Sequence, residues 1–305
     1  MLTILFAILP IFAVILIGHG TVRRPLLSPL FWAEADRLVF YLLFPALLLV
    51  SVAEAPLGHL TLGPLVLATA ASLLLVSGGL LLLRRRITAD GPSFTSVFQG
   101  AIRQNSYLCF AVALALEGQP GVEALAIAVA IYVPIVNVLS TVVLMHYGAL
   151  ASRGGLGRVF LAVLKNPLMV AILLGLALNV SGTGLHAALV SVLTILGNAA
   201  LCLGLLAVGA GLDLGAARSE ARLVALGVLV KLAAMPLLAL AATRLFGVEG
   251  LASFALVLLA GSPTAGAAYI MARQMGGNAP LVANIITVQV FVSLVSLPLV
   301  LGLLG

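Results

Sequence analysis

The sequence has very little charge. Only 8% of its 305 residues are charged, whereas 63% are apolar, and the mean hydropathy is +1.29. Soluble domains carry about 25% charged residues, so a water-soluble surface cannot be assembled from this composition. A span of about 20 apolar residues crosses the hydrocarbon core of a bilayer, and ten such spans nearly exhaust the chain. The composition therefore predicts an all-α membrane protein with ten transmembrane helices.

Residues typical of catalytic, redox or metal-binding sites are also scarce. Cys109 and Cys202 lie in apolar stretches without a spacing pattern, which favours packing residues over a disulfide or a redox pair. The four histidines stand at span ends and no two have ligand spacing, so no metal site is expected. No catalytic or nucleotide-binding motif occurs, and no carboxylate lies deep in a span. We therefore expect a protein that is not an enzyme and that needs no cofactor.

The apolar segments divide the chain into ten expected helices. The first, Leu2–Ile17, has no basic residue before its apolar run and no small-residue cleavage site after it, so we interpret it as an uncleaved span and not as a signal peptide. The remaining spans are expected at 37–53, 62–83, 96–116, 123–145, 167–180, 187–211, 222–243, 251–272 and 280–303.

The basic residues predict the orientation of these spans. Twelve of the fifteen Lys and Arg residues fall in odd-numbered connections, only Arg244 falls in an even one, and Arg103 and Lys231 lie inside spans. Cytoplasmic connections retain positive residues, so both termini are predicted to lie outside. This topology, together with contact between the basic loops and the lipid bilayer, explains the net charge of +6, and a nucleic-acid partner is not needed.

The chain is predicted to contain two inverted repeats. Five spans lie in residues 1–146 and five in 166–305, joined by a cytoplasmic connection at 147–165. An odd number of spans per half inverts the second half relative to the first, as in many transporters. Spans 1 and 6 share a Pro-x7-Gly frame, at Pro10 and at Pro167.

Spans 4 and 9 correspond in the same way, and both contain residues that interrupt a helix. Gly118 follows Asn105 by 13 residues, and Gly276 follows Pro263 by 13. Proline removes a backbone donor, and a polar run surrounds Asn105. Non-helical backbone at mid-membrane persists only where protein or a wet cavity satisfies it. We therefore predict broken helices 4 and 9 that cross at mid-membrane.

The two breaks together are expected to form one anion-binding site. Asn105 and Thr264 are suitable N-caps for the half-helices that follow, and opposed helix N-termini create a site for a carboxylate. The alternative is a proline kink whose polar residues hydrogen-bond between helices. The candidate substrate-binding residues are Arg103, Asn105, Ser106, Lys231, Ser262, Pro263, Thr264 and Gly266.

Lys231 has two interpretations. At 1.5 Å per residue it lies about 13 Å into its span, where it would add positive potential to the site or stand where a cation could otherwise bind. Alternatively, its side chain snorkels toward the inner interface.

Several segments resemble the auxin efflux carrier family, which includes plant auxin exporters and bacterial malate or malonate permeases. The segments are RLVFYLLFP at 37–45, KNPLMVAILLG at 165–175, LAVGAGL at 206–212, KLAAMPL at 231–237 and SPTA at 262–265. They are similar to helices 2, 6, 7, 8 and 9 of that family. Each motif is short, and the order and spacing make the resemblance specific.

The resemblance implies a bile-acid-symporter-like fold. A scaffold of helices 1, 2, 6 and 7 would support a transport domain of helices 3–5 and 8–10, and Asn105 matches the asparagine of the helix-4 crossover. The chain departs from the family at Tyr107 to Val112, where members usually place glycine and proline. It also lacks the long cytoplasmic loop of the plant exporters, which favours a bacterial carrier in the inner membrane.

The predicted function is secondary transport of a small organic anion, such as a carboxylate or an auxin-like acid, by elevator-type alternating access. One alternative is a sodium-coupled symporter of the bile-acid or pantothenate type, although sodium favours oxygen ligands that are often carboxylates and the crossover has none. Another is a membrane sensor or scaffold that binds a ligand without moving it. The sequence leaves open whether the chain forms a homodimer.

Overall fold

The structure, a computed structural model, describes residues 2–24, 27–55, 62–149, 166–212 and 220–304. All regular secondary structure in this part of the chain is helical, which confirms the predicted class. Seven helical segments there are long and apolar enough to cross a membrane, and Pro167–Ser181 and Gly250–Gly261 are shorter apolar helices. Most of the predicted connection at 147–165 lies outside the described residues.

Each predicted span overlaps a helix, and the helical segment around the second span begins at Pro29 instead of residue 37. The first half contains α1 (Leu2–Arg23), α2 (Pro29–Leu38), η1 (Val39–Leu43), α3 (Phe44–Ala53), α4 (Leu62–Leu82), α5 (Arg84–Ile87), α6 (Gly91–Ile102) and α7 (Ser106–Tyr147). The second half contains α9 (Pro167–Ser181), α10 (Ala187–Ala210), α11 (Ala221–Leu229), η3 (Val230–Ala234), α12 (Met235–Leu245), α13 (Gly250–Gly261), α14 (Ala267–Met275) and α15 (Ala279–Leu301). The expected spans 4 and 5 meet within α7, which bends at Gly118, where φ is 62°.

Two continuous helices contain a π-helical turn in their middle. These turns, η1 and η3, join α2 to α3 and α11 to α12, and each is followed by a proline at the second residue, Pro45 or Pro236. Proline has no N–H, so one hydrogen bond to the preceding turn is already missing there. The chain can therefore adopt the wider π geometry without losing a further hydrogen bond. The first amide after each π turn donates to a carbonyl five residues earlier, Phe44 to Val39 and Met235 to Val230.

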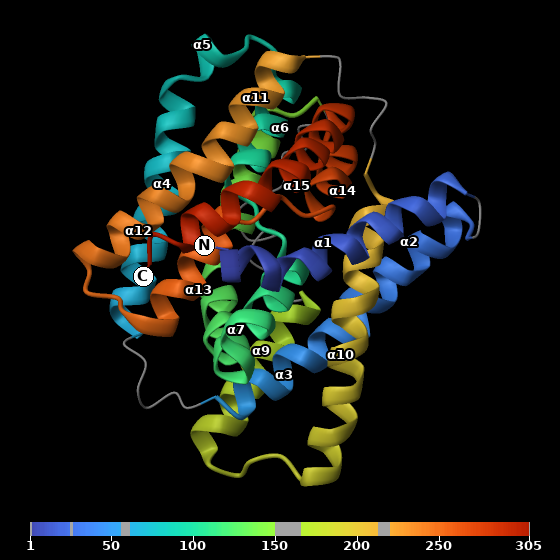
Figure 1. Cartoon of the computed structure of the whole chain (residues 1–305). Coiled ribbons are helices and arrows are strands. Elements are labelled where there is room, and N and C mark those ends of the chain that lie inside the picture. Colours follow the sequence, from blue (N-terminus) through green and yellow to red (C-terminus); the bar gives the residue numbers. More distant parts are fainter. Residues whose placement is uncertain (1, 25–26, 56–61, 150–165, 213–219, 305) are drawn as a thin grey trace.

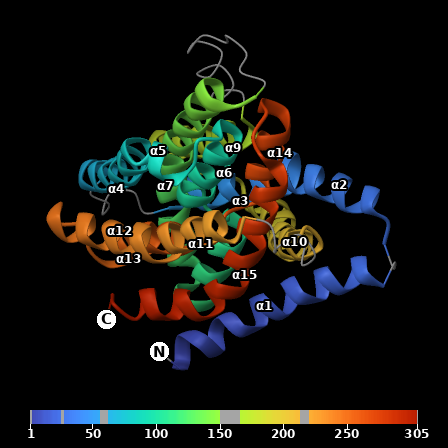
Figure 2. The same cartoon turned by 90° about the horizontal axis from the view of Figure 1, so that it is seen from above.

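A first helix group consists of α1, α2–η1–α3, α9 and α10. Helix α1 crosses α10 (Figures 1 and 2), and α3 packs on both α9 and α10. The Asn179 amide of α9 donates to three carbonyls at the C-terminal end of α3, those of Val52, Ala53 and Ala55, at 3.1, 2.9 and 2.7 Å. This side chain satisfies carbonyls that a helix end leaves without partners, and it joins two segments far apart in the sequence.

A second helix group consists of α4, α6, α7, α11–η3–α12, α13, α14 and α15. Figure 2 shows α4 and α11 to α13 on one side of the molecule, with α1, α2 and α10 on the other. Asn278 joins the N-terminal ends of α6 and α15. Its side-chain Nδ2 lies 2.9 Å from Ser93 Oγ, and its backbone carbonyl accepts from Ser96 Oγ at 2.9 Å. Both helix breaks lie in this group.

Close contact between α1 and α10 depends on two glycines. A Cβ atom at Gly18 would overlap the carbonyl oxygen of Leu206, and one at Gly209 would overlap that of Ile15. Small residues allow the backbones of membrane helices to approach in this way. We therefore expect Gly18→Ala to lower the free energy of unfolding by about 1–3 kcal/mol, the usual cost of overpacking.

Gly20 is the matched control for this substitution. A Cβ atom there would meet nothing within 4 Å, so Gly20→Ala should leave stability unchanged or slightly raised, because alanine favours helix. Thermal unfolding of both variants in detergent checks the difference. Equal melting temperatures would contradict the close packing of α1 on α10.

Candidate functional site

Both helix breaks predicted from the sequence are present. The first separates α6 from α7, where Arg103 has φ −76° and ψ 151° and Asn105 has φ −100° and ψ 95°. The second separates α13 from α14 and begins at Ser262, with φ −75° and ψ 150°. Extended backbone leaves amides and carbonyls without intrahelical partners, and inside an apolar protein these groups require partners from elsewhere.

Asn105 connects the two breaks. Its Oδ1 accepts from the Leu108 amide at 3.2 Å, which confirms it as the N-cap of α7. Its own backbone amide lies 3.4 Å from Ser262 Oγ in the second break. The side chain is fully buried, and Nδ2 has no hydrogen-bond partner among the described residues. One strong donor therefore remains available at the junction of the breaks.

Thr264 does not cap the following half-helix, so that prediction was wrong. Helix α14 begins at Ala267, and its N-cap is Gly266, which provides no side-chain hydrogen bond. The Thr264 hydroxyl instead donates to the carbonyl of Gly100 at 3.0 Å and lies 3.4 Å from that of Arg103. These carbonyls lose their helical partners where α6 ends, so the hydroxyl stabilises the first break instead of the second.

Two residues that the sequence analysis missed complete the end of α6. Gln289 of α15 donates from Nε2 to the carbonyl of Gly100 at 2.7 Å and accepts from the Thr264 amide at 2.8 Å. Tyr132 of α7 donates to the carbonyl of Ile102 at 3.0 Å. Both side chains are fully buried. A glutamine within an apolar span is a signal that could have identified the first of them.

Lys231 is fully buried, so the snorkelling interpretation is wrong. Its Nζ donates to the carbonyl of Leu259 at 3.1 Å, and the Ser262 hydroxyl donates to the same oxygen at 3.0 Å. In a continuous helix this carbonyl would accept from residue 263, but Pro263 has no N–H. The proline therefore leaves an unsatisfied acceptor, and the lysine and the serine both bind it. Nζ also lies 5.9 Å from the centre of the Tyr132 ring.

The other candidate residues surround these contacts at different depths. Arg103 is half-buried, with Nη1 3.1 Å from the Met271 sulfur of α14. Pro263 is buried, Ser106 is half-buried at the first turn of α7, and Gly266 is exposed. The structure thus brings the predicted residues together at the two breaks, with Ser106 and Gly266 nearest the surface. No cluster of three or more potential metal ligands occurs among the described residues.

Comparison with known families identifies the type of protein. A family model described as "Membrane transport protein" matches residues 151–301. This family is of the auxin efflux carrier type, and the match covers the second half of the chain. The resemblance drawn from short motifs is therefore confirmed, and the protein is a multi-pass membrane transporter. The match includes the second break, Lys231 and Gln289, whereas the first break precedes it. A search of curated proteins gives no match.

The Thr264 hydroxyl provides a test of this transporter's helix breaks. Thr264→Val keeps the side-chain shape and removes one of the two donors to the Gly100 carbonyl, which keeps its bond from Gln289. We therefore expect the free energy of unfolding to fall by about 0.5–1.5 kcal/mol, the net contribution of one hydrogen bond. Thr243→Val is the matched control, because among the described residues the buried Thr243 hydroxyl binds only the carbonyl three residues earlier in its own helix. Chemical denaturation in detergent should show the larger loss for Thr264→Val. Equal losses would contradict the cross-helix role of Thr264.

Proposed function

We propose that the protein is a secondary carrier for a small organic anion, such as a carboxylate or an auxin-like acid, that binds at the two helix breaks. The observation that carries this proposal is the buried Nδ2 amide of Asn105, next to the first turn of α7, which has no hydrogen-bond partner in the described part of the chain. Buried donors are almost always satisfied in folded proteins. A helix N-terminus also offers free amides and a positive dipole end, so a carboxylate oxygen is the partner that suits this position.

The charges around the breaks also favour an anion. Arg103 lies in the first break, and Lys231 binds the carbonyl that precedes the second. The hydrogen bonds described above at the breaks involve amides, hydroxyls, carbonyls and the Lys231 amine, and no carboxylate takes part in them. A protonated Lys231 and the Arg103 guanidinium would therefore add positive potential that no acidic neighbour in these contacts offsets.

The glycine conformations support two inverted five-helix repeats. Each break is followed by a short helical segment that ends 13 residues after its reference residue, Asn105 or Pro263. The end is a glycine with positive φ in both cases, 62° at Gly118 and 75° at Gly276. Glycine adopts this conformation without steric cost, so the matched spacing has a physical basis. The repeats would comprise residues 1–146 and 166–305, with crossed broken helices 4 and 9.

The two helix groups support an elevator mechanism. The first group corresponds to the expected scaffold helices 1, 2, 6 and 7, and the second to the transport helices 3–5 and 8–10. The Tyr107 ring of α7 packs edge-on against Phe44 of α3, with ring centres 4.9 Å apart, and fits against Gly204 of α10. The inter-helix hydrogen bonds described above stay within one group. An apolar contact of this kind can slide without breaking hydrogen bonds.

Burial of the site also favours alternating access. Asn105, Ser262 and Thr264 are fully buried, so an anion can reach them only after the surrounding helices move. With both termini outside and the basic connections inside, movement of the second group against the first would expose the breaks to each side of a bacterial inner membrane in turn.

Flux measurements test the anion site. The purified protein is reconstituted in liposomes and assayed with labelled malate, malonate and auxin. Losing a hydrogen bond to a charged ligand costs roughly 1.5–3 kcal/mol, which corresponds to about a 10- to 150-fold loss of affinity. We therefore expect Asn105→Ala to lower substrate affinity at least about tenfold while the protein remains monodisperse in detergent.

Asn166→Ala is the matched control for this experiment. Asn166 caps α9 with its side chain, as Asn105 caps α7, but it lies in the other helix group. Its substitution removes a cap at similar cost to stability and should leave affinity unchanged. Unchanged affinity and turnover in Asn105→Ala would mean that the breaks are only packing features. Binding of the anions without any flux would favour the sensor alternative.

Sodium replacement separates the proposed carrier from a sodium-coupled symporter. Because no carboxylate takes part in the described contacts at the breaks, we expect flux without strict sodium dependence. The measurement compares liposome flux in sodium and in potassium at the same substrate gradient. Flux that disappears when potassium replaces sodium would support the symporter.

A further inference from the structure

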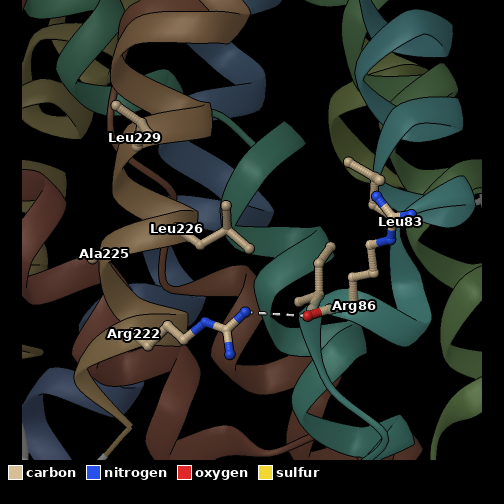
Figure 3. A pocket seen from close by; sticks show the side chains of 7 residues that line it. Leu83, Arg86, Arg222, Ala225, Leu226 and Leu229 are labelled. Carbon is tan, nitrogen blue, oxygen red and sulfur yellow. Dashed lines mark hydrogen bonds between the residues drawn. The ribbon is translucent and has the colours of Figure 1, made fainter.

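A groove lies between the end of α4, the short helix α5 and the start of α11, away from the helix breaks. It is about 420 Å³ in volume and is lined by Leu83, Arg86, Ile87, Arg222, Ala225, Leu226 and Leu229 (Figure 3). Two of these side chains end in guanidinium groups and the rest are apolar. The groove is therefore amphipathic, and both of its charges have the same sign.

Arg222 is held across the groove by a hydrogen bond. Its Nη2 donates to the backbone carbonyl of Arg86 at 3.2 Å, so the side chain reaches from α11 toward α5 (Figure 3). Both arginines are exposed. A guanidinium has five N–H donors in a planar fork, and this bond uses one of them, so donors remain for a second partner.

Neither arginine has a carboxylate partner among the described residues, where the one ion pair joins Arg37 and Glu34. The two acidic side chains nearest to these arginines in the described part of the sequence have other partners. Asp90 accepts from the Ser93 amide at 2.8 Å, and the Glu220 carboxylate lies 3.4 Å from the Asn278 amide. The positive charge of the groove is thus available for a ligand.

The neighbouring Arg84 differs from these two arginines, because its guanidinium lies over aromatic rings. The Arg84 guanidinium lies 4.3 Å from the centre of the Tyr147 ring and 5.9 Å from that of Phe94. Stacking on two aromatic rings holds this group inside the protein. Arg86 and Arg222 have no such ring contact in the described part of the chain, and their charges face outward.

We infer that this groove binds an anionic phospholipid. The lipid phosphate would accept from the Arg222 guanidinium, and an acyl chain would lie along Leu226 and Leu229. The Arg86 guanidinium, which is directed toward Leu83 and away from Arg222 (Figure 3), would add positive charge at the same groove. Guanidinium forks suit phosphate oxygens, and basic pockets between membrane helices suit anionic headgroups. A free phosphate would bind the arginines alone and would leave Leu226 and Leu229 without an apolar partner, although Leu229 is 63% exposed.

The position in the fold agrees with this ligand. Helices α4 and α11 both belong to membrane-spanning segments, and the groove lies where those segments end in basic residues. The start of α11 also adds the positive end of its helix dipole. The basic connections are predicted to face the cytoplasm, the side that attracts anionic lipid through such residues. This inference does not depend on the proposed transport of an organic anion.

Lipid-dependent stability of the purified full-length protein tests the inference. Thermal unfolding in detergent is followed while phosphatidylglycerol or phosphatidylcholine is added. We expect phosphatidylglycerol to raise the melting temperature of the wild type and phosphatidylcholine to have little effect. Combined Arg86→Gln and Arg222→Gln substitutions should lower the apparent affinity for phosphatidylglycerol by about tenfold or more.

Two further variants keep the test independent of folding defects. Arg86→Gln alone leaves the bond from Arg222 to the backbone of residue 86 in place, and it should still weaken phosphatidylglycerol binding. Arg244→Gln removes one exposed charge from the far end of the same long helix and should behave as the wild type. Equal stabilisation by phosphatidylcholine, equal stabilisation by inorganic phosphate, or full retention of the lipid effect in the double variant would overturn the inference.

Discussion

Three buried carbonyls determine how the second helix group is held together. The helix breaks free the carbonyls of Gly100, Ile102 and Leu259, which donors from other helices or from the break itself satisfy. Without such partners each buried polar group would cost several kcal/mol in an apolar interior. The interruption of two helices therefore requires α6, α7, α13, α15 and η3 to pack in one arrangement.

The two broken helices end differently in chemical terms. The carbonyl end of α6 binds neutral donors, the side chains of Thr264, Gln289 and Tyr132. The carbonyl end of α13 binds the Lys231 amine together with the Ser262 hydroxyl. A helix C-terminus carries partial negative charge, so a cation stabilises it more than a neutral donor does. The second break is therefore the more strongly polarised of the two.

The sequence predicted the helices well, because each membrane span needs a run of apolar residues and little else. It also predicted the breaks, since Pro263 and the polar run around Asn105 act on their own backbone. The errors concern partners that only the packing defines. Thr264 binds a carbonyl 164 residues away, and Gln289 binds two carbonyls on different helices. Lys231 binds the Leu259 carbonyl, which Pro263 leaves without a helical donor, and this carbonyl lies on another span.

The burial of Lys231 has an electrical consequence. When protonated, its amine places a positive charge in the helix group that we propose to move, together with that of Arg103. Moving one elementary charge through the full membrane potential involves about 2.3 kcal/mol per 100 mV. An empty carrier would therefore sense voltage as it reorients, whereas a bound carboxylate would cancel one of the two positive charges. Loaded and empty forms would then respond to voltage differently, and voltage would act more strongly on the return of the empty carrier than on the loaded step.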